Sequence, residues 1–262
     1  MPSANQPISL FLSPCSKIIV ALIFVLFASV EQQAEGSDFT RSTTSKCQKS
    51  NAPPTYTSLE ELMLAAKTGN PTAQVVLGWL YYKGEDVPQD FKEAVKWFRL
   101  AAEQGYRGGQ CQLAICYLRG DGVSKDHSEA AKWFRLAAEQ DSPFAQSLLG
   151  YLYLAGVGVI QDEEEGYRWI LKAAEGGDDI AQCVLGSAYE SGPVVDQDFI
   201  QAYMWYDLSA EQGNDRAIKA RAKLSSRMTP EQISEAKKLS TEFVPRRQRR
   251  TGSNLGGSIQ HE

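Results

Sequence analysis

The sequence contains only two histidines, His127 and His261, and they lie far apart in the chain. Catalytic triads and most metal sites need a histidine close to a nucleophile or to further ligands, so this scarcity argues against both kinds of site. No strand pattern is present, so no glycine-rich phosphate loop can follow a strand. We therefore expect a protein that is not an enzyme and that binds no metal and no cofactor.

An excess of positive charge is also missing. The 262 residues include 27 Lys and Arg against 32 Asp and Glu, a formal net charge of -5. Binding to nucleic acid depends on clustered cations that neutralise phosphates, so the folded part is not expected to bind nucleic acid. With 43% hydrophobic residues, the chain can nevertheless bury a substantial core.

Cysteines are few and show no pairing pattern. Cys111 and Cys116 are five residues apart on one expected helix, which points them roughly 140° apart and prevents a bridge. Cys111 and Cys183 occupy the same position two repeats apart, so a helical hairpin should separate them. We interpret these residues as small thiols that are buried or half-buried in the core.

The sequence has no apolar run that is long enough for a stable membrane span. Its longest run, residues 18–30, follows Lys17 and would reach roughly 20 Å as a helix, short of the ~30 Å hydrocarbon layer. We therefore predict that residues 1–34 are a signal peptide, with Ala34 the better cleavage residue, and that the protein is periplasmic or secreted. An uncleaved membrane anchor is the alternative.

What the chain does contain is a repeat. Residues 90–104 return almost unchanged as residues 126–140, after a step of 36 positions. The same pattern follows at residues 162–176 and 198–212. Each copy holds one tryptophan: Trp97, Trp133, Trp169 and Trp205. Self-similarity at this period predicts a solenoid of stacked helical hairpins.

Start and stop signals divide each repeat into a helix A and a helix B. Helix A should end at a glycine that can adopt a left-handed conformation. Helix B should begin with an Asp and a Glu or Gln that form a capping box. The helix that opens at Arg107 lacks a capping residue and should fray. The four glycines are Gly84, Gly120, Gly156 and Gly192, and the four capping residues are Asp90, Asp126, Asp162 and Asp198.

These signals predict nine segments. A disordered polar linker and a single cap helix should precede four repeats, and two cap helices and a basic disordered tail should follow them. After the signal peptide 1–34, the segments are the linker 35–57, the N-terminal cap 58–70, the repeats 71–106, 107–142, 143–178 and 179–214, the C-terminal cap 215–243 and the tail 244–262.

Residues that recur at fixed positions predict how the hairpins pack. Small residues on helix A should face the alanine pairs of helix B, so that the two axes approach closely. Tyrosines on helix A and the tryptophans on helix B should fill the layer between neighbouring units. A repeated glutamine should satisfy backbone groups between units, and contact with a ligand is the alternative. The small residues are Gly78, Ala114, Gly150 and Gly186, and the glutamines are Gln74, Gln110, Gln146 and Gln182.

Three motifs carry a resemblance to a known family. They are Leu-Gly-x-x-Tyr at residues 77–81, Gly-x-Gly-Val at residues 120–123, and Ala-x-x-Trp-Phe followed by Ala-Ala-x-x-Gly in helix B. Together they resemble the Sel-one-like repeat (SLR) family, a relative of the tetratricopeptide repeat. The resemblance departs from the family pattern at Asp86, Ala114 and Pro193.

The resemblance implies an all-α fold, a right-handed α-α superhelix of helical hairpins with terminal cap helices. It also implies a scaffold for protein–protein interactions in bacterial envelope, secretion or host-contact processes, with no catalytic motif to transfer. One exported, cysteine-rich branch of the family is associated with penicillin binding and weak β-lactamase activity. Its regular cysteine pairs are missing here, so this cell-wall-acting enzyme is the alternative function, which nitrocefin turnover would test.

In this architecture the variable face of helix A lines a concave groove. Apolar and aromatic residues alternate there with a few charges, which suits a protein or peptide ligand. Packing between units is the alternative role for each residue. The predicted face consists of Val75, Trp79, Tyr82, Lys83, Cys111, Ile115, Leu118, Arg119, Ser147, Tyr151, Leu154, Cys183, Ser187 and Glu190.

The C-terminal tail carries four arginines, Arg246, Arg247, Arg249 and Arg250. Such a run could attach the protein to an anionic surface, and the alternative is a solvated end. We expect membrane association only through this tail or through an uncleaved signal segment.

Overall fold

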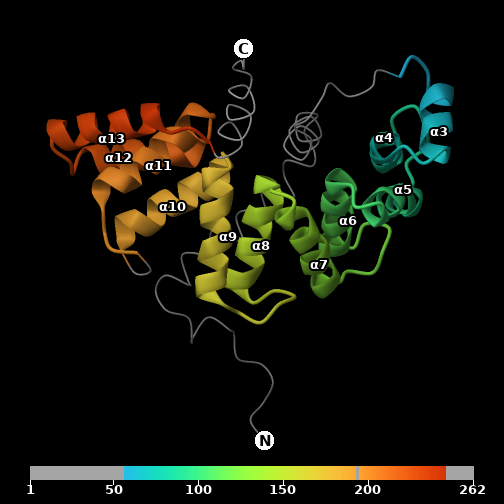
Figure 1. Cartoon of the computed structure of the whole chain (residues 1–262), viewed down its shortest axis with the longest axis horizontal. Helices are drawn as coiled ribbons and strands as arrows, with labels where there is room; N and C mark the ends of the chain where they lie inside the picture. Colours follow the sequence, from blue (N-terminus) through green and yellow to red (C-terminus); the bar gives the residue numbers. More distant parts are fainter. Residues whose placement is uncertain (1–55, 193–194, 246–262) are drawn as a thin grey trace, which may run out of the picture. The chain divides into compact units, whose positions relative to one another are not determined.

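The computed structural model describes residues 56–192 and 195–245, which form helices joined by loops and turns (Figure 1). Contacts between residues divide the described chain into two compact units. Residues up to Leu136 and Tyr151–Gly166 form unit 1, and Ala137–Gly150 with the residues from Tyr167 onwards form unit 2. The predicted signal peptide, most of the linker and the arginine-rich tail lie outside the described residues.

The described helices follow the predicted alternation of helix A and helix B. Among them, no helix is both long and apolar enough to cross a membrane. In chain order they are α3 (Leu59–Lys67), α4 (Pro71–Lys83), α5 (Phe91–Glu103), α6 (Arg107–Arg119), α7 (His127–Glu139), α8 (Pro143–Ala155), α9 (Glu163–Glu175), α10 (Asp179–Ser191), α11 (Phe199–Glu211), α12 (Asp215–Ser225) and α13 (Pro230–Glu242).

In unit 1, the helices α3 to α6 pack on their neighbours in the chain. Helix α4 contacts both α3 and α5, α5 contacts α6, and α4 also contacts α6. Helix A of the first repeat therefore lies beside helix A of the second. Helix α3 lies in front of the first repeat and packs on α4.

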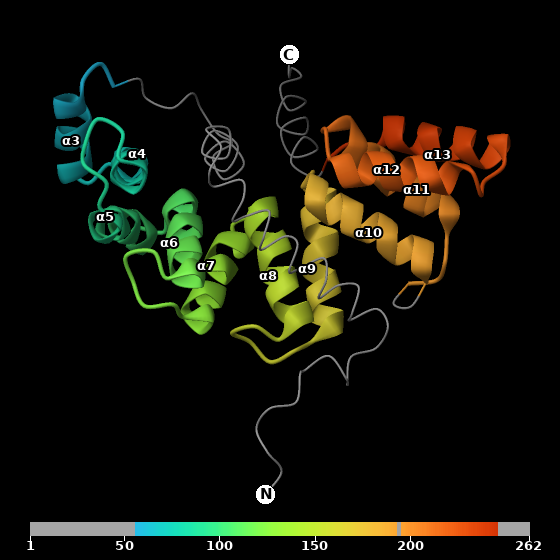
Figure 2. The ribbon, with the colours of Figure 1, turned by 180° about the vertical axis from the view of Figure 1, so that it is seen from behind.

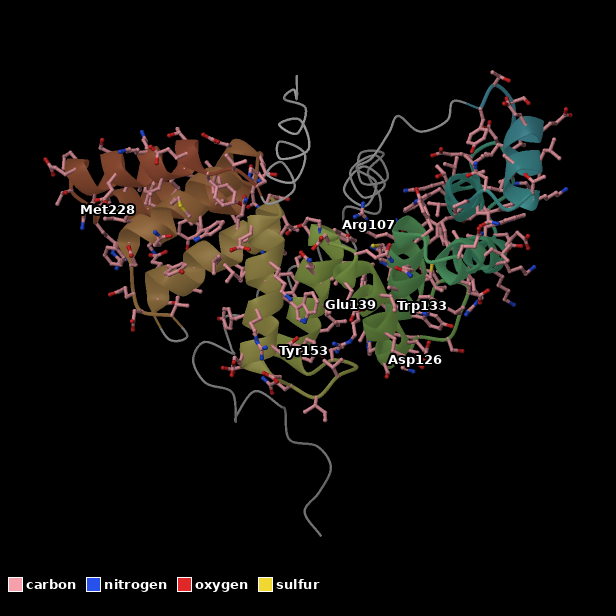
Figure 3. The ribbon with its side chains drawn as sticks, viewed as in Figure 1. Arg107, Asp126, Trp133, Glu139, Tyr153 and Met228 are labelled. Atoms are coloured by element: carbon pink, nitrogen blue, oxygen red, sulfur yellow. The ribbon has the colours of Figure 1, made fainter. Side chains whose placement is uncertain are left out.

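In unit 2, α10 packs on α11, and α11 also contacts both α12 and α13. Figure 2 shows these four helices side by side from behind. Met228 lies in the turn between α12 and α13 (Figure 3). The side chain of Asp207 on α11 is 7% exposed and pairs with Arg221, and it also accepts a hydrogen bond of 2.6 Å from Ser240. These two contacts fasten both C-terminal cap helices to the last repeat.

The helix ends form largely as predicted. Gly84, Gly120 and Gly192 close helix A in the left-handed conformation. The opening at Tyr106–Arg107 has no side-chain cap, yet α6 begins at Arg107, 36 positions after the start of α4. Its first turn is buried against the end of α5, where a Cβ on Gly109 would collide with Ala101. Packing against α5 thus stabilises the start of α6 in place of a side-chain cap.

The capping boxes of helix B are corrected by the structure. The Asp90 carboxylate accepts the backbone N–H of Glu93 at 3.0 Å, as expected. Its own backbone N–H, however, donates to the carbonyl of Tyr81 at 2.9 Å. Glu93 is then available to pair with Lys96 at 2.5 Å. In the other repeats, the backbone N–H groups of Asp126, Asp162 and Asp198 donate to the equivalent carbonyls, those of Tyr117, Tyr153 and Tyr189. A full box is present at the start of α13.

The prediction for the small residues of helix A was wrong about what they face. A Cβ added to Gly78 would lie 2.6 Å from the ring of Phe98, and one added to Gly186 would lie 2.7 Å from the ring of Tyr206. The missing side chain therefore makes room for a large ring on helix B. Close approach to an alanine pair occurs at Gly109 instead.

The tryptophans pack as predicted. Trp133 of the second repeat (Figure 3) packs against a core cluster that includes Val95 and Phe98 of the first repeat. Trp97 packs against Leu62 and Leu77, which belong to the cap helix and to α4. The tryptophans on helices α9 and α11 are also buried. The hairpins of the first two repeats therefore hide part of their apolar sides against the element before them.

Candidate functional site

The structure separates the predicted binding face into buried and partly exposed positions. Half of the fourteen side chains are buried: Val75, Cys111, Ile115, Leu118, Ser147, Tyr151 and Leu154. The other half are partly exposed: Trp79, Tyr82, Lys83, Arg119, Cys183, Ser187 and Glu190. A buried side chain cannot contact a partner directly, so direct contact would be made by the second group. That these residues bind a partner is a prediction.

In unit 1, four aromatic rings meet where α4 packs on α5. The ring of Trp79 lies edge-on to Tyr82 at 5.2 Å and to Phe98 at 5.9 Å. Tyr82 also meets Phe91, the first residue of α5, at 5.0 Å. Edge-to-face pairs of this kind are favourable beyond the area that they bury. The two aromatic residues of the predicted face are therefore held in place by rings from helix B.

The hydroxyl group of Tyr82 joins two charged groups of the second repeat. It donates to the Asp121 carboxylate at 2.6 Å and accepts from Nη1 of Arg119 at 3.1 Å. Burial raises the pKa of Tyr82 to about 12, and the hydrogen bond to Asp121 adds to the shift. Tyr82 is therefore a neutral donor near pH 7. Two ring contacts and two hydrogen bonds therefore hold the side chain of Tyr82.

Unit 2 has a related arrangement around Glu190 on α10. The Glu190 carboxylate accepts hydrogen bonds from the hydroxyl of Tyr206 at 3.0 Å and from Nη1 of Arg227 at 2.7 Å. The guanidinium group of Arg227 also lies 4.5 Å from the ring centre of Phe199. Burial, followed by the nearby Glu190 charge, raises the pKa of Tyr206 far above its ordinary value.

The repeated glutamines have a structural role, as predicted. Nε2 of Gln74 donates to the carbonyl of Ala66 at 3.1 Å, across the boundary between the cap helix and the first repeat. Its Oε1 accepts from Gln104 at 2.7 Å. In unit 2, Gln182 makes the same two contacts, with Ala174 and Gln212. These amides satisfy backbone groups and leave little capacity for a ligand.

Six members of these two clusters were not predicted from the sequence: Phe91, Phe98, Asp121, Phe199, Tyr206 and Arg227. For one of them, Arg227, the numbering contains a signal, because its spacing from Glu190 equals the spacing of the predicted residue Arg119 from Tyr82. Arg119 lies 37 residues after Tyr82, and Arg227 lies 37 residues after Glu190. Such a pair spans one repeat plus one residue, which is the spacing of helix A ends that touch across a repeat boundary.

The described cysteines are buried or half-buried, as predicted. Burial raises the pKa of the Cys116 thiol to about 12 and that of the Cys183 thiol to about 11. Burial also lowers the pKa of His127. In the part of the chain that the structure describes, no three His, Cys, Asp or Glu side chains are grouped so that they could hold a metal ion.

Comparison with known proteins adds a family and two solved structures. The family model described as Sel1 repeat matches residues 71–106, 108–142, 143–178 and 179–214. A protective antigen of uropathogenic Escherichia coli that displays an SLR fold is 38% identical, with a TM-score of 0.63 over 66% of this chain. The match spans only 37% of that antigen.

A Sel1 repeat protein from Oxalobacter formigenes is 35% identical, with a TM-score of 0.60. The match covers 70% of this chain and 78% of that protein. A sequence comparison with curated proteins gives no match. The fold of the chain is therefore that of SLR proteins, an all-helical repeat fold.

Proposed function

Because this chain belongs to the Sel1 repeat family, whose fold serves as a scaffold for protein interactions, we propose that it is a non-catalytic scaffold that binds a protein or peptide. The proposed surface is the face of the A helices that carries Trp79 and Tyr82. In a bacterial cell the scaffold would act in the envelope, in secretion or in contact with a host.

One observation carries this proposal. Trp79 and Tyr82 are partly exposed, yet their rings are fixed against each other at 5.2 Å and against Phe98 and Phe91 behind them. Interfaces concentrate binding energy in aromatic and arginine side chains that lose little freedom on binding. Arg119 is held beside Tyr82 by a hydrogen bond, which adds a third residue of this type.

Affinity capture from native cells tests the surface. We expect the variant Tyr82→Ser with Arg119→Gln to lose a bound protein that the unchanged chain retains, while its far-ultraviolet circular dichroism stays helical. The matched control is Leu100→Ser with Lys96→Gln, which changes an exposed apolar residue and a cation on α5. Loss of the same partner from both variants, or from neither, would exclude this face.

We also propose that the protein is exported. Support comes from Lys17 and the apolar run at residues 18–30, which have the charge and length of a signal peptide. Amino-terminal sequencing of the protein recovered from the periplasm or the medium tests this point. A chain that remains in the cytoplasm and still begins at Met1 would contradict it.

A further inference from the structure

Three leucines of unit 1 face solvent at the same position of the repeat. Leu64 on α3 is 64% exposed, Leu100 on α5 is 44% exposed and Leu136 on α7 is 43% exposed. They follow one another at steps of 36 residues, the length of one repeat. Single exposed leucines are common on protein surfaces. A leucine that is exposed in three successive helices at one position instead marks a surface that the core does not use.

On α5, side chains of opposite charge flank this leucine. Lys96 lies four residues before Leu100, and Glu103 lies three residues after it. All three are exposed, and residues spaced by three or four share one side of a helix. Lys96 also pairs with Glu93 at 2.5 Å, yet its side chain remains 70% exposed and can donate to a second carboxylate. The outer side of α5 therefore carries a cation, an apolar group and an anion in line.

Helix α3 has the same arrangement with the two signs exchanged. The exposed Glu60 lies four residues before Leu64, and the exposed Lys67 lies three residues after it. On α7, the exposed Lys132 again lies four residues before Leu136. Opposite charges on the two sides of an exposed leucine are thus present on both α3 and α5.

This order of charges fits a second copy of α5 that runs in the opposite direction. At a rise of about 1.5 Å per residue, Lys96 lies about 6 Å to one side of Leu100 and Glu103 about 4.5 Å to the other. If two α5 helices cross about a twofold axis at Leu100, Lys96 of each copy faces Glu103 of the other. The symmetry makes the same pair twice. A parallel crossing of α5 on its copy would place Lys96 against Lys96, where like charges repel.

We propose that the outer side of α5, centred on Leu100, is the contact surface of a homodimer in which the two α5 helices run antiparallel. The two leucines would form an apolar centre and the two Lys96–Glu103 pairs a charged rim, as in other protein interfaces. One helix on one helix buries less area than a standard interface, so the dimer should dissociate on dilution. The surface lies on a B helix, and the proposal is independent of what the A helices bind.

Sedimentation equilibrium of the full chain, over a range of concentrations, tests the dimer. We expect Leu100→Glu to abolish association, because it places a charge at the centre of the contact. Lys96→Glu and Glu103→Lys should each weaken association about tenfold, because an exposed pair is worth up to about fivefold and each change reverses two symmetry-related pairs. Both reversals in one chain should restore association, because the two pairs form again with their signs exchanged.

The matched control is Lys219→Glu, which reverses the charge of an exposed lysine on α12 and should leave association unchanged. A doubly reversed chain that associates as weakly as the single variants would overturn the antiparallel pairing. Restoration of Lys96→Glu by Glu60→Lys would also overturn it, in favour of a parallel contact between α3 and α5. A chain that is monomeric at every concentration would overturn the dimer. Its leucine surface would then belong to another protein, which Leu100→Glu should fail to capture from cells.

The dimer and the partner of the A helices can be tested separately. Tyr82→Ser with Arg119→Gln should still dimerise, although it loses the captured protein. Leu100→Ser with Lys96→Gln should keep the captured protein, although it dimerises less. Loss of the dimer in the first of these variants would contradict the assignment of the contact to α5.

Discussion

Gly122, in the loop of the second repeat, lies directly against the backbone carbonyl of Phe91 in the repeat before it. A Cβ at this position would overlap that carbonyl, and Gly158 approaches His127 in the same way. The φ angle of Gly122 is +70°, which also favours glycine. This loop glycine is therefore part of the contact between repeats.

The first repeat does not have this loop glycine. Asp86 occupies the equivalent position, with a φ of +59°. The preceding cap helix begins only at Leu59, four positions later in the repeat than α5 begins at Phe91. At the equivalent place before the first repeat, the described residues 56–58 lie outside the helix. An Asp is tolerated because it has no helix end to meet, and Asp is among the residues that adopt a left-handed conformation.

Gly122→Ala should lower the free energy of unfolding by about 3 kcal/mol, because it adds both backbone strain and a collision. Denaturation in guanidinium chloride, followed by circular dichroism, measures the change. Asp86→Gly is the control and should shift stability by less than about 1 kcal/mol. An unchanged midpoint for Gly122→Ala would mean that the loop does not pack on Phe91.

Gln74→Leu should destabilise the first repeat by about 1–3 kcal/mol, because it removes a buried hydrogen bond to the Ala66 carbonyl and one of the two hydrogen bonds that the Gln104 amide donates. Thermal melting of the variant measures the loss. Gln89→Ala is a useful comparison, since the exposed Gln89 also donates to a carbonyl, that of Tyr82. The comparison variant should lose less. A larger loss for Gln89 would contradict the importance of the buried amide.

Trp133→Ala should cost about 3–5 kcal/mol, the range for removing a large aromatic side chain from a core. Trp133→Phe should cost much less, because the buried indole nitrogen of Trp133 has no hydrogen-bond partner. Urea denaturation of both variants separates ring packing from hydrogen bonding. If the two variants were equally unstable, the indole nitrogen would have to contribute a contact of its own.

Alkaline pH should destabilise the protein through Cys116. Burial raises the pKa of its thiol from 9.0 to about 12, so the unfolded thiol ionises first as pH rises. The folded state then binds one proton more than the unfolded state, and stability falls from about pH 9 towards pH 12. The free energy of unfolding, measured at pH 8 and at pH 10.5, tests this fall in stability. Cys116→Ala should have a shallower decline, and an identical decline would remove Cys116 as its source.

The binding face could be predicted only in outline. Spacing along helix A places Val75 and Trp79 on one side of the helix, one turn apart, but the structure buries the first and leaves the second partly exposed. A periodic pattern shows which residues share a side of a helix. It does not show how deeply the neighbouring helix covers that side. The same limit explains why the partners of Tyr82 were not foreseen.

The repeat itself, the helices and most of their caps were determined by the sequence alone, because each depends on residues within a few positions of one another. The 36-residue step, the Asp90-type N-caps and the left-handed glycines are local signals of this kind. Tertiary structure decided the rest. In the folded chain the Asp90 N–H donates to the carbonyl of Tyr81 rather than to the side chain of Glu93. The ring of Phe98 fills the space beside Gly78. Such choices depend on distances between helices, which packing sets and spacing in the chain does not.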